Sequence, residues 1–249
     1  MNTLLGLLII AVGSFCQSSS YVPIKKVKEW SWESFWLVQG IFAWLVFPLL
    51  GALLAVPAGS SLGEILSTDP SAAFKAAGYG VLWGVGALGL ILLLGVSITL
   101  AGIAVIGYAG SLRSQNMTDE EKRAAVKDFA LTKGLAVALL AGVMSACFNL
   151  GLEAGRPLQV EGGSALFRTL PATLMVTLGG FVTNAAYCLW QNARNRTFGD
   201  YGKGTLYANN LLFCALAGAL WYSQFFGFGI GQTFFEPGSV VAAFAWCIL

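Results

Sequence analysis

The sequence predicts an all-α protein, a polytopic bundle of transmembrane helices. Of its 249 residues, 57% are hydrophobic and only 10% are charged, whereas soluble domains carry about 25% charged residues. Long apolar runs recur along the chain between short polar loops, and most reach the roughly 20 residues that a helix needs to cross a bilayer. So few charges cannot cover a water-exposed surface, and we expect residues 1–249 to form one transmembrane domain.

Six of the apolar runs are expected to span the membrane. The third is too long for one perpendicular helix and has no internal turn, so it is expected to tilt or protrude. A seventh run is about half the length of a span, which predicts that the chain lacks further C-terminal spans. The expected spans are residues 3–24, 34–56, 78–112, 134–152, 169–190 and 208–235, and the partial run is 240–249.

The distribution of Lys and Arg predicts the orientation of the chain. Cytoplasmic loops accumulate these residues, and the loops after the first, third and fifth runs hold 11 of them, against 3 in the alternate loops. The N-terminus is therefore expected outside the cell, in a bacterial inner membrane. The same count favours one crossing for the third run, because splitting that run would place the later basic loops on the opposite side.

Composition also excludes several kinds of function. A net charge of +2 is too small for nucleic-acid binding. The chain has no histidine, so proton chemistry falls to carboxylates. No nucleophile with a base, metal cluster or phosphate loop is recognisable, and we expect neither an enzyme nor a bound cofactor or metal. The pattern Gly84-Val-Gly86-Ala-Leu-Gly89 lies inside an apolar run rather than after a strand, so it indicates helix packing instead of dinucleotide binding.

Polar side chains within the apolar runs are the candidate functional residues, because each is costly at membrane depth unless it is paired or lines a wet cavity. Two interpretations stay open: hydrogen bonds between helices, or a cavity for an uncharged, hydroxyl-rich solute. The candidates for solute binding are Asn149, Asn184, Asn210 and Gln224, and Gln17 and Gln39 also lie in the runs.

Two tryptophans sharpen the second interpretation. Trp83 and Trp221 lie well inside their runs, where an indole ring could pack on the apolar face of a sugar or simply on other helices. Trp221 and Gln224 are three residues apart and would share a helix face. Near the end of the fourth run, Glu153 is the candidate proton-coupling carboxylate, although it could instead pair with Arg156.

The segment Tyr21-Val-Pro-Ile-Lys-Lys-Val-Lys-Glu-Trp-Ser-Trp-Glu33, with residues 82–86, 102–110, 133–157 and 210–231, resembles the L-rhamnose/proton symporter family of the drug/metabolite transporter superfamily. The resemblance implies an alternating-access carrier that imports L-rhamnose or a similar neutral sugar with a proton. It also implies ten spans in two inverted repeats, of which this chain would lack an internal segment and the last spans. A carrier for another small metabolite and a noncatalytic membrane scaffold are the alternatives.

Overall fold

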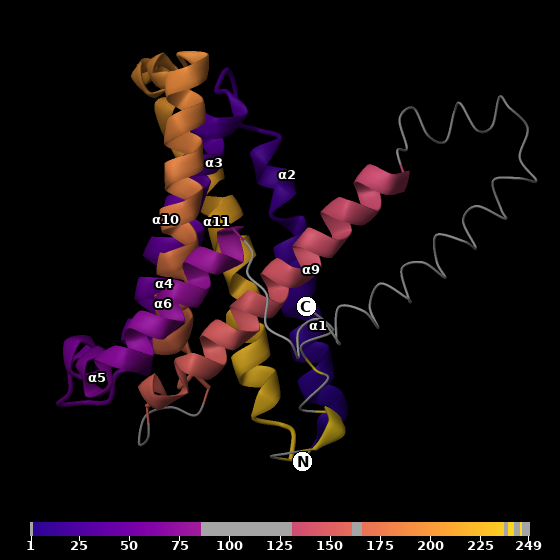
Figure 1. Cartoon of the computed structure of the whole chain (residues 1–249), viewed down its shortest axis with the longest axis vertical. Coiled ribbons are helices and arrows are strands. Elements are labelled where there is room, and N and C mark those ends of the chain that lie inside the picture. The colour runs from indigo at the N-terminus through magenta and orange to yellow at the C-terminus, as the bar shows by residue number, and fades with distance from the viewer. Residues whose placement is uncertain (1, 86–130, 161–165, 237–238, 242–244, 246–249) are drawn as a thin grey trace, which may run out of the picture.

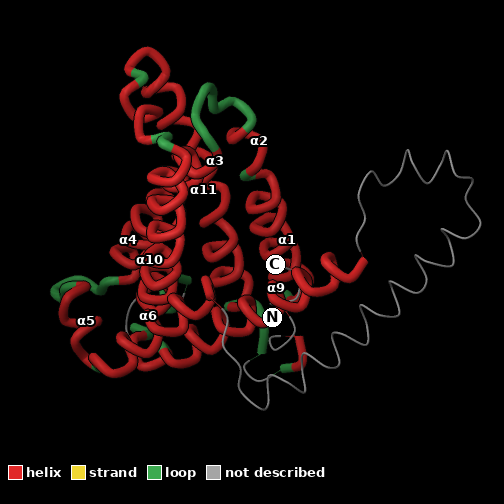
Figure 2. The backbone as a smooth tube through the Cα atoms, turned by 45° about the horizontal axis from the view of Figure 1, so that its top comes forward, coloured by secondary structure: helices red, strands yellow, loops and turns green. Residues whose placement is uncertain are grey.

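The computed structural model describes residues 2–85, 131–160, 166–236, 239–241 and 245, and these residues form helices and connecting loops without a strand (Figures 1 and 2). The predicted all-α fold class is thereby confirmed. Most of the expected third run, with Gly86 and Gly89 of the glycine pattern, lies outside the described residues, as does most of the final partial run.

The described residues form a succession of helices. In chain order they are α1 (Thr3–Ser19), α2 (Tyr21–Ile24), α3 (Trp32–Ile41), the π-helix η1 (Phe42–Val46), α4 (Phe47–Ala55), α5 (Leu62–Thr68), α6 (Pro70–Val85), α9 (Leu131–Ala154), the 3₁₀-helix η2 (Arg156–Leu158), α10 (Leu170–Asn195), the 3₁₀-helix η3 (Phe198–Gly202) and α11 (Gly204–Gln232).

Among the described residues, four helical stretches are long and apolar enough to cross a membrane: Thr3–Ile24, Trp32–Ala55, Leu170–Asn195 and Leu206–Gln232. They coincide with four of the six expected spans. Helix α9 covers the expected range 134–152, and α6 covers the start of the expected range 78–112. The exact boundaries of the membrane-embedded segments remain predictions.

A π-helical turn beside a proline interrupts the second of these stretches. Pro48 has no N–H to offer the carbonyl of Trp44, four residues earlier, so a regular α-helical bond is impossible there. The π-helix Phe42–Val46 precedes this proline and joins α3 to α4. π-helical turns inside α-helices frequently occur at functional sites, and this one carries Trp44 near the middle of the stretch.

Glycines allow α6 and α10 to cross closely. A Cβ added at Gly80 would collide with the carbonyl oxygen of Val176, and one at Gly179 would collide with that of Ala77. Gly151 of α9 also packs closely, since a Cβ there would lie 2.8 Å from the Val176 side chain. Small residues let helix backbones approach in this way.

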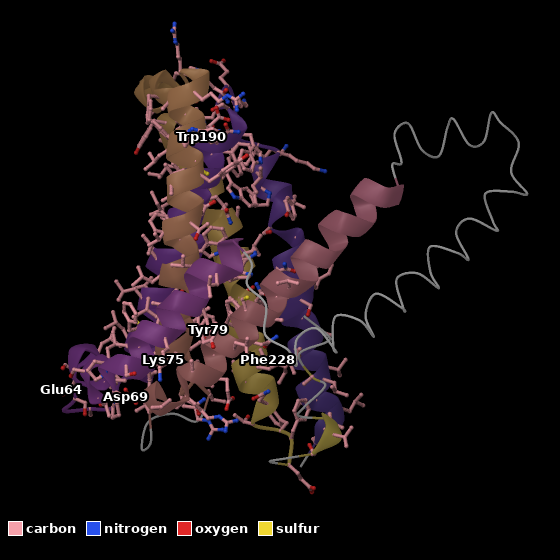
Figure 3. All side chains as sticks on the ribbon, in the orientation of Figure 1. Glu64, Asp69, Lys75, Tyr79, Trp190 and Phe228 are labelled. Carbon is pink, nitrogen blue, oxygen red and sulfur yellow. The ribbon has the colours of Figure 1, made fainter. Side chains whose placement is uncertain are left out.

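The two ends of the bundle differ in chemistry (Figure 1). The basic end holds the α2–α3 loop and the α10–η3–α11 turn, with Lys25, Lys26, Lys28, Arg194, Arg196 and Lys203. The opposite end, which we call the cavity end, holds α5, η2 and the last turn of α11. Residues labelled in Figure 3 mark the two ends: Trp190 lies toward the basic end of α10, whereas Glu64, Asp69 and Lys75 lie at the cavity end.

Candidate functional site

Three tryptophans from three separate helical segments meet in the interior of the bundle. The ring centroid of Trp44 on η1 lies 5.7 Å from that of Trp83 on α6 and 5.7 Å from that of Trp221 on α11. The rings of Trp83 and Trp221 are stacked at 6.2 Å. Phe148 and Phe225 extend this group toward the cavity end, since Phe148 lies 4.8 Å from Trp83 and Phe225 lies 5.6 Å from Trp221. The structure thus joins Trp83 and Trp221, as the sequence suggested, and adds Trp44.

The local sequence positions each ring. Gly180 of α10 leaves room for Trp83, because a Cβ there would lie 2.6 Å from its indole. Trp44 and Trp221 each lie within two residues of the midpoint of an apolar helical stretch, and so does Asn184 on α10. Side chains from three different stretches therefore gather at one depth, and we call Trp44, Trp83, Asn184 and Trp221 the mid-span site.

Several buried polar atoms near this depth have no hydrogen-bond partner among the described residues. They include the indole N–H of Trp44, Oε1 of Gln39 and Nδ2 of Asn184. Asn184 Nδ2 and the Trp44 indole both pack against Gly40. A Cβ added to Gly40 would lie 2.5 Å from Asn184 Nδ2 and 3.5 Å from Trp44 Cε3, so the unpaired amide nitrogen and the indole are neighbours. Buried donors and acceptors are nearly always paired in proteins, and unpaired ones call for an explanation such as a ligand.

A cavity of about 590 Å³ opens at the cavity end, which is within the usual size range of small-molecule sites. Its walls carry polar groups from α9, η2, α10 and α11, and Phe225 of its lining also touches Trp221. Another lining residue, Phe228, is labelled in Figure 3. The polar lining residues are Asn149, Glu153, Arg156, Gln159, Thr169, Thr173 and Gln232. Two sequence candidates, Asn149 and Glu153, therefore lie in this cavity rather than at the mid-span site.

Glu153 does not have the surroundings of a proton-coupling group. Its side chain is 63% exposed, and its carboxylate lies 3.3 Å from the guanidinium of Arg156. In the structure Glu153 therefore forms the ion pair that the sequence allowed as the alternative, at the surface and with a partner three residues later.

The side-chain amides of two further candidates form hydrogen bonds with backbone groups. The amide of Asn210 donates to the carbonyl of Lys28 at 2.8 Å and accepts from its N–H at 2.9 Å, which fastens the α2–α3 loop to α11 at the basic end. The amide of Gln224 donates to the carbonyl of Trp221 at 2.8 Å within its own helix. The structure brings neither of them to the mid-span site.

A buried polar network at the basic end was missed at the sequence level. Glu33, at the start of α3, is 5% exposed, and Asn192 of α10 is fully buried. Asn192 Oδ1 accepts from the hydroxyls of Ser34 and Thr197, both at 2.9 Å. The one sign of this network in the sequence is that the carboxylate Glu33 stands directly before an apolar run, next to Trp30 and Trp32.

Asp200 in η3 anchors the other side of this network. Burial disfavours its ionised form, but the N–H of Ser31 at 2.7 Å, the ammonium of Lys203 at 2.9 Å and the hydroxyl of Ser34 at 3.0 Å outweigh burial and lower its pKa to about 2. Nearby, burial raises the pKa of Tyr201 above its usual value. Asp200 is therefore a permanently ionised, structural carboxylate at neutral pH.

Within the described part of the chain, no group of three or more His, Cys, Asp or Glu side chains could hold a metal ion. The arrangement offers stacked aromatic faces, neutral amide groups and unpaired N–H and carbonyl atoms at mid-depth. This chemistry suits a neutral solute with hydroxyl groups and an apolar ring face better than a charged one.

Comparison with known proteins gives consistent matches. The L-rhamnose-proton symport protein family matches residues 1–92 and 76–238. Proteins named L-rhamnose-proton symporter from Yersinia pestis (strain Pestoides F) and Yersinia pseudotuberculosis serotype O:1b (strain IP 31758) are each 28% identical over 92% of this chain and 80% of their own length. The protein of that name from Yersinia pestis bv. Antiqua (strain Antiqua) is 28% identical over 90% of this chain and 78% of its own. No solved structure matches.

The alignments bear on the expected internal deletion. The match to the first relative runs over 289 positions but includes only 92% of this chain's 249 residues, about 229. About 60 positions of that relative, inside the matched region, therefore have no counterpart here. The two matched segments of the family also overlap in residues 76–92, within α6 and the residues that follow it.

Proposed function

Because this chain belongs to the L-rhamnose-proton symport protein family, a family of membrane transporters, we propose that it imports L-rhamnose or a similar neutral sugar together with a proton. The transported solute enters from the cavity end and is held at the mid-span site. Carriers of this kind bind their solute near the bilayer midplane and expose it alternately to the two sides.

The observation that carries this proposal is that Trp44, Trp83 and Trp221 meet at mid-span, near the unpaired Nδ2 of Asn184. L-Rhamnose is a deoxy sugar with a methyl group and several hydroxyls. Indole faces pack on its C–H surface, while the Trp44 N–H and the Asn184 amide offer donors to its hydroxyls. Asn149 lines the entrance cavity, Asn210 fastens the α2–α3 loop to α11, and the Gln224 amide bonds within its own helix.

We place the basic end in the cytoplasm and the N-terminus outside the cell, in the inner membrane of a bacterium. The excess of Lys and Arg in the loops of the basic end supports this orientation. The cavity then opens to the outside, and a proton entering down its gradient supplies about 2.3 kcal/mol per 100 mV of membrane potential for sugar uptake.

Counterflow in proteoliposomes tests the proposal. Vesicles loaded with unlabelled L-rhamnose and diluted into labelled L-rhamnose should take up label transiently and saturably, without a proton gradient. Excess unlabelled L-mannose or L-fucose outside tests the sugar specificity. Uptake of another metabolite instead of L-rhamnose would indicate a carrier of different specificity, and no exchange of any solute by folded protein would favour the scaffold alternative.

A further inference from the structure

Glu33 is an unusual carboxylate in this protein. Its Oε1 accepts from the amide of Asn195 at 2.9 Å and from the hydroxyl of Thr197 at 2.8 Å, both of which are neutral donors. No Lys or Arg among the described residues lies within ion-pair distance of it. A buried carboxylate without a cationic partner is unusual, and the hydrogen bonds from its neutral donors are what hold it in the ionised form.

The other described carboxylates are less suited to binding a transported proton. Asp200 is buried but paired with Lys203. The remaining ones are exposed or half-buried: Glu29, Glu64, Asp69, Glu153 and Glu236. Glu33 alone among these side chains combines burial with the absence of a cationic partner.

A chain of polar contacts connects Glu33 with the mid-span site. On one face of α10, the thiol of Cys188 donates to Asn184 Oδ1 at 3.6 Å, and the amide of Asn192 donates to the carbonyl of Cys188 at 2.9 Å. The hydroxyl of Thr197 then lies 2.9 Å from Asn192 Oδ1 and 2.8 Å from Glu33 Oε1. Asn184 and Asn192 are eight residues apart, about 12 Å along the helix. We call Asn184, Cys188, Asn192 and Thr197 the polar ladder.

The hydroxyl of Thr197 gives this ladder two states. It has one proton but lies within hydrogen-bond distance of two acceptors, the carboxylate of Glu33 and Oδ1 of Asn192. While Glu33 is ionised, the stronger, charge-assisted bond goes to the carboxylate. Once Glu33 is protonated, it can donate to the Thr197 oxygen, and the Thr197 proton then turns to Asn192.

We propose that Glu33 is the proton-binding group of the carrier and that its ionised form holds the basic end closed through Asn195 and Thr197. Protonation removes the charge from both hydrogen bonds, loosens α3 from the end of α10, and favours opening toward the cytoplasm, where the proton leaves. The proposal rests on the function proposed above for its link to sugar transport, although the closing role of Glu33 can be tested without any sugar.

The charged and titratable groups around Glu33 do not replace it in this role. On α10, Cys188 is buried, and Arg194 and Arg196 are exposed and form no ion pair with it. Across the network, Asp200 is already held ionised, with Lys203 paired to it, and Tyr201 keeps its proton because burial raises its pKa. On the α2–α3 loop, Lys28 and Glu29 are exposed. Glu33 is the described group of this end that is free to take up a proton.

Labelling of Cys188 tests the closing role directly. Cys188 is fully buried one turn from Asn192, so it becomes reactive when the basic end opens. In a background with the other four cysteines changed to Ala, Glu33→Gln, which imitates the protonated acid, should raise the labelling rate at pH 7.5 at least tenfold. Glu64→Gln serves as the matched control, because Glu64 is exposed in the α5 capping box and Gln can also cap. It should leave the rate unchanged.

The pH dependence of Cys188 labelling in the protein with Glu33 unchanged is a second test, which does not depend on the folding of the Glu33→Gln variant. With 4,4′-dithiodipyridine, which reacts with thiols even in acid, labelling of wild-type Cys188 should speed up as the pH falls from about 5 to about 3, through and below the usual titration range of a glutamate. In Glu33→Gln it should be fast at every pH. Equal rates in wild type, Glu33→Gln and Glu64→Gln with similar melting temperatures, or a wild-type rate that does not change with pH, would overturn the proposal.

Transport links the inference to sugar uptake. Glu33→Gln should keep L-rhamnose counterflow but lose accumulation driven by a pH gradient, and Thr197→Val should shift the pH profile of accumulation without abolishing it. Gradient-driven accumulation that survives in Glu33→Gln, or that is lost in Glu153→Gln instead, would contradict the assignment. If wild-type protein shows no L-rhamnose counterflow, the proposed substrate fails, and the Cys188 labelling still decides the role of Glu33.

Discussion

The indole N–H of Trp44 offers a sharp test of the mid-span site, because a second tryptophan provides a matched control. Both Trp44 and Trp30 bury an N–H group that has no partner among the described residues. Trp44 lies in the mid-span site, whereas Trp30 packs at the basic end against Tyr201 and Tyr207, at ring distances of 5.6 and 6.0 Å. Replacing each with Phe removes the same donor and a similar volume in two different places.

The two replacements should have similar effects on stability. Losing part of the ring leaves a small cavity, which costs about 1 kcal/mol. Removing a buried donor that has no partner relieves a desolvation penalty of similar size. The melting temperatures of Trp44→Phe and Trp30→Phe should therefore stay within a few degrees of wild type.

Their effects on sugar binding should differ. If the Trp44 N–H donates to a sugar hydroxyl, Trp44→Phe leaves that hydroxyl buried without a partner, which costs about 1 to 3 kcal/mol, or roughly five- to more than a hundredfold in affinity. Trp30→Phe should leave the affinity unchanged. Equilibrium binding of labelled L-rhamnose to detergent-solubilised protein measures both, and equal affinity in the two variants, whether lowered or intact, would refute the placement of the sugar at Trp44.

Three further predictions concern stability and the role of Gln224. Asp200→Asn should lower the free energy of unfolding near pH 7 by about 2 kcal/mol, because a folded-state pKa of about 2 means that the ionised form stabilises the fold above its usual pKa. The wild-type protein should lose this contribution as the pH falls from about 4 to 2, whereas the variant should not. Thermal melts across that pH range measure the difference. Gly179→Ala should destabilise the α6–α10 crossing by about 1 to 3 kcal/mol, because its Cβ meets the Ala77 carbonyl, while Gly78→Ala, with open space around it, should be neutral or slightly stabilising; equal melting temperatures would contradict the close crossing. Gln224→Ala should change L-rhamnose affinity less than twofold, and a loss above fivefold in the binding assay would return Gln224 to the site.

Hydropathy and loop charge were sufficient to predict the fold class. The apolar runs are so long that helix is the only regular structure able to satisfy their backbone within a bilayer. Trp83 and Trp221 were singled out because both lie deep in their runs, but the contact between them was not predicted. The role of Trp44 was not foreseen, since its position depends on the π-helical turn that precedes Pro48, and a sequence does not reveal how such a turn rotates the residues that it carries.

The remaining differences arise from local geometry that spacing alone leaves undecided. Gln224 and Trp221 were expected to face one solute together, but the Gln224 amide reaches back to the carbonyl one turn earlier, a bond that any polar side chain on a helix can make. Glu153 was favoured because it follows an apolar run, yet the helix continues to Ala154 and presents the carboxylate to solvent beside Arg156. Glu33 was overlooked because its burial depends on Asn195 and Thr197, which are distant in sequence.

Coupled uptake of sugar and protons tests the central claim most directly. Purified protein is reconstituted into vesicles that contain a fluorescent pH indicator, and labelled L-rhamnose is added outside without an initial pH gradient while its uptake is followed in parallel. The account predicts that L-rhamnose acidifies the vesicle interior saturably, in proportion to the sugar taken up, and that Glu33→Gln takes up sugar without acidification. Sugar uptake by the wild-type protein with no change in internal pH would contradict proton symport.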